Sequence, residues 1–216
     1  MIEINRVIGA VFKVSDSSRS NMKHFRTYFA HVLLVVPVFA FALVAMPAPA
    51  HHSSVAGVTI DNFGKINDNY YRGSQPNQEE FGQLKRLGIK TVIDLREDYK
   101  KNEESWVREV GMNYVRIPLK TRVAATEEQW KYFLSLVNDP TNQPVYVHCK
   151  GGRHRTGAMT AVYRITHDGW TADQAYEEMK DYDFENGFLG GPAAQKKFVF
   201  TFYQQNRSAV AAGNQK

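Results

Sequence analysis

The chain has 216 residues, which is enough for one domain with a substantial core and short for two. Hydrophobic residues at 43% and aromatic residues at 12% are typical of a globular protein and exclude a mainly disordered chain. The formal net charge is +5, but residues 1–50 hold five basic and two acidic residues. The rest of the chain therefore carries only +2, which excludes a broad basic surface for nucleic acid. The single cysteine, Cys149, excludes an internal disulfide and a cysteine-based metal cluster.

Residues 22–50 have the layout of a secretory signal peptide. A basic start precedes a mostly apolar run over residues 32–46, and Ala-Pro-Ala at 48–50 supplies a small-x-small cleavage site. We therefore expect residues 1–50 to be a leader and the mature protein to be exported, either periplasmic or secreted, with no stable membrane insertion after cleavage. The alternative is an uncleaved anchor in the inner membrane, although the apolar run is shorter than the roughly 20 residues of a spanning helix.

The pattern of the remaining chain predicts a linker over residues 51–61, one domain over 62–206 and a disordered tail over 207–216. Short β-branched or alternating runs predict a hairpin over 63–72 and strands over 90–95, 114–119 and 144–148. Helical spacing predicts helices over residues 77–87, 103–110, 156–169 and 193–204. Two further helices are expected to begin at Thr126 and at Thr171, where Thr171 and Gln174 form a capping box. Because strands alternate with helices, we expect an α/β domain with a mostly parallel central sheet flanked by helices.

Residues 148–157, with the sequence HCKGGRHRTG, lie between the last expected strand and a helix. Glycines let the backbone turn tightly, so that successive N–H groups point inward as an anion-binding nest. The N-terminus of the following helix adds free N–H groups and the positive end of its dipole. These features predict a phosphate-binding loop formed by Lys150, Gly151, Gly152, Arg153, His154 and Arg155.

The inward N–H groups and the helix N-terminus also indicate roles for four side chains of this segment. Inward N–H groups and nearby cations lower the pKa of a thiol into the range of about 3.5–7.5, so Cys149 is the expected nucleophile. Arg155 follows it by six positions, and its planar fork suits two phosphate oxygens at once. The Thr156 hydroxyl is expected to help the sulfur leave during hydrolysis, and His148 is expected to orient the loop.

The sequence HCKGGRHRTG resembles the HCxxGxxR(S/T) signature of the protein tyrosine and dual-specificity phosphatase superfamily. The stretch from NYYRGSQP through VIDLR to the loop is similar to the atypical dual-specificity phosphatases of plants and fungi and to their bacterial relatives, over about residues 62–182. The resemblance implies a dual-specificity phosphatase-like fold, Cys149 as the phosphocysteine nucleophile, Arg155 as the transition-state clamp, no cofactor and no metal.

The expected partner is a phosphorylated substrate, either a protein or a small molecule. The sequence predicts no oligomeric state. Lys150, Arg153 and His154 either point to solvent or face the pocket. In the second case they favour a substrate with several phosphates, such as an inositol polyphosphate or pyrophosphate, over a phosphotyrosine protein. Some atypical relatives with similarly basic loops have that activity.

The sequence departs from the superfamily at the proton donor. The loop that usually carries an acidic residue, residues 117–125, contains none. Glu97, Asp98, Glu127 and Glu128 are candidate donors, but each is more simply a surface charge or a helix start. We therefore assign no general acid from the sequence.

Other functions remain as alternatives. One is a phosphate-binding module with little or no catalysis, which the presence of both Cys149 and Arg155 disfavours. Another is a rhodanese-like or arsenate-handling enzyme with a similar anion loop. A rhodanese would not require the Thr-Gly pair after the arginine, and a cysteine-relay arsenate reductase would need further cysteines.

Overall fold

We describe a computed structural model of the chain, which covers residues 56–98, 102–185 and 192–213. All of these residues belong to one compact unit, Met46–Lys216. The expected leader lies outside the described residues. Among the described residues, no helix is both long enough and apolar enough to cross a bilayer.

The described part of the chain is built on a five-stranded sheet with the order β1-β2-β5-β3-β4. The strands are β1 (Gly64–Asn67), β2 (Tyr70–Gly73), β3 (Thr91–Arg96), β4 (Asn113–Leu119) and β5 (Val145–His148). β1 and β2 form the expected antiparallel hairpin, and β2, β5, β3 and β4 are parallel neighbours. The predicted α/β fold with a mostly parallel sheet is therefore confirmed.

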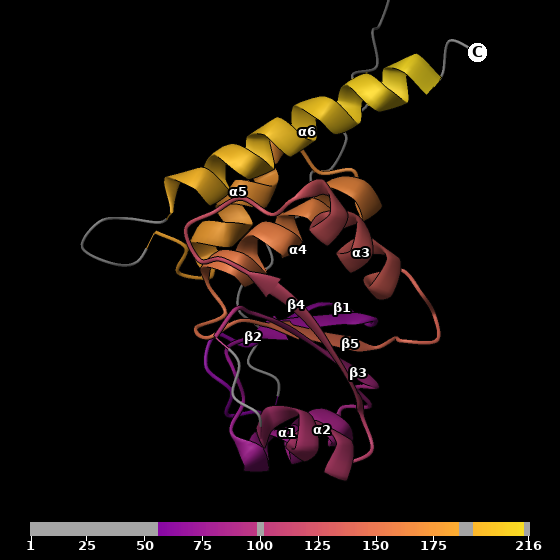
Figure 1. Ribbon diagram of the computed structural model, residues 1–216, viewed down its shortest axis with the longest axis vertical. Coiled ribbons are helices and arrows are strands. Elements are labelled where there is room, and N and C mark those ends of the chain that lie inside the picture. Colours follow the sequence, from indigo (N-terminus) through magenta and orange to yellow (C-terminus); the bar gives the residue numbers. More distant parts are fainter. Residues whose placement is uncertain (1–55, 99–101, 186–191, 214–216) are drawn as a thin grey trace, which may run out of the picture. The chain divides into compact units, whose positions relative to one another are not determined.

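Helices cover both faces of this sheet (Figure 1). On one face lie α1 (Gln78–Arg86) and α2 (Asn102–Glu109). On the other lie α3 (Glu127–Val137), α4 (His154–His167), α5 (Ala172–Asp181) and α6 (Ala193–Gly213). Capping boxes begin α1 at Asn77, α3 at Thr126 and α5 at Thr171, so local side-chain chemistry fixes these three starts.

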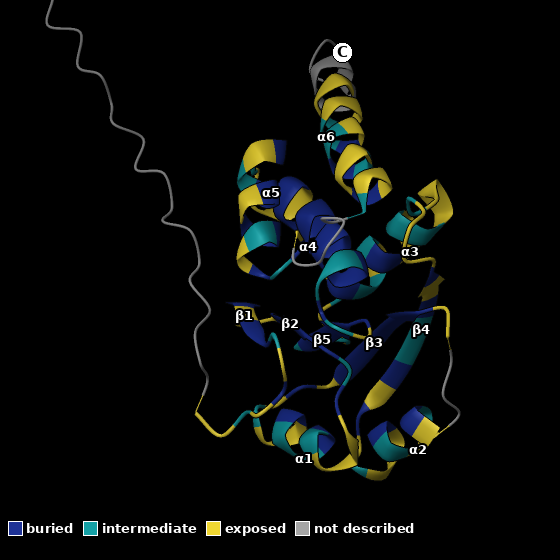
Figure 2. Ribbon diagram, turned by 90° about the vertical axis from the view of Figure 1, so that its left-hand side faces the viewer, coloured by how far each residue is buried: buried dark blue, intermediate teal, exposed yellow. Residues whose placement is uncertain are grey.

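Helix α4 is the most enclosed helix of the described fold. Its residues 155–165 are all buried, as Figure 2 shows by its dark colour. The sheet lies on one side of α4, and α3, α5 and α6 pack around the rest. Because α4 directly follows β5, the segment between them starts and ends on elements that are fixed by the core.

The structure differs from the sequence-based expectation at three boundaries. The expected linker packs against the domain: Ile60 is buried, and the Thr59 amide donates to Gln83 Oε1 at 2.8 Å. Helix α6 continues to Gly213 through the expected tail, where closely spaced alanines favour helix. Helix α4 begins at His154 rather than Thr156, so the arginine of the loop motif lies in its first turn.

Candidate active site

Residues 149–153 connect β5 to α4, and donors from outside hold the carbonyl groups of this loop. Because C=O and N–H of a trans peptide point in opposite directions, carbonyls held outward turn the N–H groups of residues 151–153 inward. This is the arrangement that the predicted anion nest requires. The contacts are Gln75 N to Lys150 O (3.2 Å), Asn62 Nδ2 to Gly151 O (3.2 Å) and Arg72 Nη2 to Gly152 O (2.5 Å).

The two glycines of the loop have different roles. Gly152 has φ +66°, and a Cβ there would lie 2.5 Å from the backbone of Gly73. Only glycine fits that position without strain. At Gly151 a Cβ would meet nothing closer than the Arg153 side chain at 3.9 Å, which is ordinary contact. The tight turn therefore depends on Gly152, whereas both glycines were expected to serve it.

Cys149 directly follows β5 and is 3% exposed. Burial alone raises the pKa of its thiol, but the hydroxyl and amide of Thr156 and the charges of Arg155 and His148 outweigh burial and lower the pKa below its ordinary value. The buried Thr156 hydroxyl has no hydrogen bond of ordinary geometry in the described structure, so its effect on the sulfur comes from proximity. This environment favours the thiolate that a nucleophilic cysteine needs.

Arg155 extends from the first turn of α4 and is 6% exposed. Its Nη1 donates to the Leu119 carbonyl at 3.3 Å and lies 3.5 Å from Asp98 Oδ1. Its Nε is buried and has no hydrogen-bond partner among the described residues. The guanidinium therefore keeps an unused donor next to Cys149, where a phosphate oxygen would bind.

His148, the last residue of β5, connects the loop to a buried cluster of charges. Its Nδ1 donates to the Cys149 carbonyl at 3.3 Å, and its Nε2 lies 2.9 Å from Glu103 Oε1, at an angle outside that of a good hydrogen bond. Burial lowers the pKa of His148, but the carboxylates of Glu103 and Asp94 outweigh it and raise the pKa. The raised pKa favours the imidazolium, whose positive charge helps to lower the pKa of Cys149.

The cluster behind His148 is held by ion pairs. Arg96 donates to both oxygens of Asp94, at 2.8 Å and 2.7 Å, and also contacts Glu103. Tyr114 adds a hydrogen bond to Asp94 at 2.8 Å, and Gln75 adds one to Glu103 at 2.8 Å.

One ligand atom each from Asp94, Glu103 and His148 lies within 4.8 Å of the others, which is close enough for a metal ion. The Arg96 guanidinium already pairs with both carboxylates and would repel a cation. The group therefore fits an ion-pair network better than a metal centre.

A cavity of about 480 Å³ opens over Cys149. Lys150 is exposed at its edge, and Arg153 Nη2 lies 3.6 Å from Asp183 Oδ2. Burial and neighbouring arginine charges lower the pKa of His154, so it lines the cavity as a neutral ring and not as the expected cation. The lining residues are Asp61, Thr121, Cys149, Lys150, Gly151, Arg153, His154 and Arg155.

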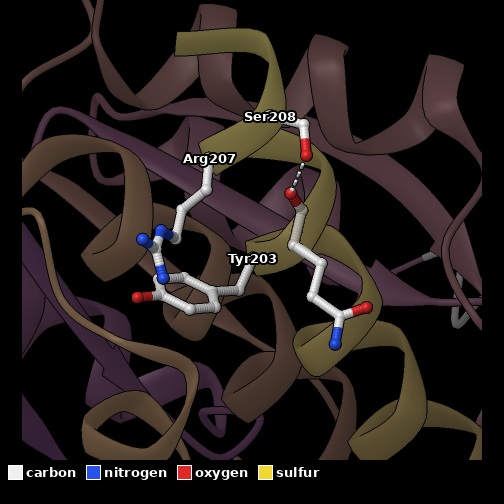
Figure 3. A pocket seen from close by; sticks show the side chains of 4 residues that line it. Tyr203, Arg207 and Ser208 are labelled. Atoms are coloured by element: carbon white, nitrogen blue, oxygen red, sulfur yellow. Dashed lines mark hydrogen bonds between the residues drawn. The ribbon is translucent and has the colours of Figure 1, made fainter. Parts of the chain in front are cut away.

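A second hollow of about 330 Å³ lies along α6 (Figure 3). The Ser208 hydroxyl donates to the Gln204 carbonyl at 3.0 Å, and the Arg207 guanidinium lies 5.7 Å from the centre of the Tyr203 ring. These four residues line the hollow and include no cysteine, no histidine and no carboxylate that could activate the Ser208 hydroxyl. The chemistry therefore belongs to the first cavity.

Sequence reasoning did not assign several residues that support the loop. Arg72 is fully buried, donates to Gly152 and stacks 3.8 Å from the centre of the Tyr182 ring. Asn62 contacts the loop at Gly151, and Glu103 contacts His148 directly before it, both from distant positions in the chain. Arg72 lies in the NYYRGSQP segment, where the resemblance to phosphatases was the only available signal.

A buried cysteine with a lowered pKa, an arginine facing it and an inward-turned amide loop define the class of cysteine-dependent phosphatases. A sequence model of the family described as "DSP-PTPase phosphatase fused to NAD+ Kinase" matches residues 50–199. The chain belongs to this dual-specificity phosphatase family. The match confirms the family and the class of function predicted from the loop motif.

Individual relatives support the same assignment. The chain is 30% identical over 148 residues to the dual specificity protein phosphatase TpbA of Pseudomonas aeruginosa strain UCBPP-PA14, covering 68% of this chain and 66% of TpbA. It is 29% identical over 168 residues to the inositol diphosphatase SIW14 of Saccharomyces cerevisiae, covering 71% of this chain and 55% of SIW14. The chain thus spans about two thirds or less of the length of these curated relatives.

Solved structures of the same two proteins have a similar fold. The core catalytic domain of SIW14 superposes with a TM-score of 0.59 at 24% identity, covering 72% of this chain and 94% of that domain. TpbA superposes with a TM-score of 0.55 at 26% identity, covering 73% of this chain and 91% of TpbA. The predicted dual-specificity phosphatase fold is therefore confirmed.

Proposed function

We propose that the protein hydrolyses phosphate esters through a phosphocysteine intermediate on Cys149. The observation that carries this proposal is a buried thiol that shares a cavity with Arg155 inside the amide loop, where Thr156, Arg155 and His148 lower its pKa. In the first step the thiolate attacks phosphorus, the S–P bond forms and the ester oxygen leaves. Water then attacks the phosphocysteine and releases inorganic phosphate.

The loop stabilises both steps through groups that are already in position. Arg155 and the inward N–H groups of residues 151–153 neutralise the charge that develops on the phosphoryl oxygens. The buried Thr156 hydroxyl lies ready to donate to the sulfur when the S–P bond breaks. His148, held by Glu103, keeps positive charge close to the thiolate.

Two substrate classes are consistent with the cavity. A polyphosphorylated small molecule is favoured by Lys150 and Arg153, which carry positive charge near the cysteine. SIW14 is named an inositol diphosphatase. A phosphotyrosine protein is the other class, and a Cys-to-Ser variant of TpbA has been solved with phosphotyrosine.

The test is phosphate release from an aryl phosphate, phosphotyrosine peptides and inositol pyrophosphates. We expect the wild-type protein to release phosphate from at least one class and Cys149→Ser to be slower by at least about a thousandfold. Rapid acid quenching and mass spectrometry should find a phosphoryl group on the Cys149 peptide of the wild type. Full activity in Cys149→Ser would contradict the mechanism.

We also propose that the protein is exported and that the leader is removed after Ala50. The proposal is supported by the basic, apolar and small-residue order of residues 22–50 and by a family match that starts at residue 50. Cell fractionation, followed by mass spectrometry of the mature N-terminus, tests this proposal. An intact leader in the membrane fraction would favour the anchored alternative.

A further inference from the structure

The reaction needs a proton donor for the leaving oxygen, and two described carboxylates lie where they could serve. Residues 117–125, which form the end of β4 and the loop after it, carry no acid. Asp61, from the segment before β1, is among the residues that line the cavity. Asp98, two residues past the end of β3, lies with its Oδ1 3.5 Å from Arg155 Nη1.

Asp98 is the better placed of the two because it contacts the phosphate-binding group itself. Arg155 Nη1 also donates to the Leu119 carbonyl, which holds the guanidinium between the end of β4 and the loop that follows β3. In an in-line displacement, a phosphoryl group bound to this guanidinium has its leaving oxygen opposite the Cys149 sulfur. The Asp98 side chain is 68% exposed, so it lies on the outer side of the site and exchanges protons with solvent.

We propose that Asp98 is the proton donor of the reaction, an inference that rests on the phosphatase function proposed above. As the S–P bond forms and the P–O bond of the ester breaks, the Asp98 carboxyl gives its proton to the departing oxygen. In the second step, the Asp98 carboxylate takes a proton from the attacking water. The new O–P bond forms, the S–P bond breaks, and the electron pair returns to sulfur. The cycle ends with the thiolate and the protonated acid restored.

Bound substrate changes the surroundings of Asp98. A phosphate dianion held by Arg155 lies next to the Asp98 carboxyl, so proton transfer to the leaving oxygen takes place beside the bound phosphoryl group. The other charged or titratable groups that face the cavity, from the segment before β1, the loop and the start of α4, are Asp61, Cys149, Lys150, Arg153 and His154.

The experiment compares Asp98→Asn with Glu97→Gln. Glu97 is the preceding residue and is also exposed, so its variant removes the same charge from a neighbouring position. Both are assayed on a series of aryl and alkyl phosphates with increasingly poor leaving groups. We expect kcat of Asp98→Asn to fall about a hundredfold on alkyl phosphates and less than about tenfold on a nitrophenyl phosphate. The decline of kcat at high pH, which reports a protonated acid, should disappear. Asp98→Glu should recover part of kcat, and Glu97→Gln should match the wild type.

Two results would overturn the inference for Asp98. An unchanged kcat with a lower KM in Asp98→Asn would mean that Asp98 only competes with phosphate for Arg155. Loss of the high-pH decline in Asp61→Asn, and not in Asp98→Asn, would assign the role to Asp61. If the wild type releases no phosphate and forms no phosphocysteine, the proposed function itself fails, and the inference fails with it.

Discussion

The floor and the mouth of the candidate active site are held in different ways. At the floor, Cys149 and His148 are buried, and the loop between them and α4 is fixed by outside donors to three successive carbonyls. At the mouth, Lys150 and Asp98 are exposed, and Asp98 makes one ion-pair contact at 3.5 Å. The difference indicates that phosphate capture is preorganised, whereas the choice of leaving group depends on side chains that solvent reaches.

Among changes that keep Cys149, the largest effect is expected at Arg155, where the floor meets the substrate. Arg155→Lys keeps the charge but loses the planar fork, so kcat should fall about 10²- to 10³-fold. Steady-state kinetics on an aryl phosphate measures the loss. Arg153→Lys, two residues earlier in the loop, is the matched comparison and should cost less than about tenfold. Equal losses in the two variants would contradict the separation of floor and mouth.

The backbone of the floor can be tested through the two glycines. Gly152→Ala forces a Cβ onto a left-handed residue that lies against the Gly73 backbone, so the free energy of unfolding should fall by about 3 kcal/mol. Gly151→Ala has room for its methyl group and should cost less than about 1 kcal/mol. Denaturant unfolding compares the two variants. A similar cost at both positions would mean that loop crowding, and not the conformation of Gly152, holds the turn.

The smallest effect is expected from the charge cluster behind the floor. Without the Glu103 carboxylate the pKa of His148 falls, so less positive charge lies near the sulfur and the pKa of Cys149 rises. In Glu103→Gln, the midpoint of the pH dependence of iodoacetamide alkylation should therefore move upward, toward the value of about 8.5 for an ordinary thiol. Glu104→Gln, at the neighbouring half-buried position, is the control and should leave the midpoint in place. A purely structural role of Glu103 would lower stability without moving the midpoint.

Local chemistry explains which parts of the fold were predictable. The helix starts at Asn77, Thr126 and Thr171 follow from side chains that bond to amides three residues later, so a short window contains the whole cause. The burial of Ile60 depends on a core that forms far along the chain, and the segment looked like a linker for that reason.

The same distinction applies to the site. Cys149 lies directly after β5 and Arg155 lies in the first turn of α4, six positions later, so one short motif predicted them together. Arg72 reaches Gly152 across 80 positions, and Asn62 reaches Gly151 across 89. Asp98 and Arg155 come together because parallel strands place the loops after β3 and β5 at one edge of the sheet. A linear reading of the sequence contains no sign of such contacts.

The single cysteine of the chain has a consequence for redox chemistry. A thiol with a lowered pKa is readily oxidised to sulfenic acid, which a second cysteine commonly rescues as a disulfide. These 216 residues contain no second cysteine. Oxidised Cys149 therefore has only an external thiol or a neighbouring backbone amide as a route back, and further oxidation would inactivate the nucleophile permanently.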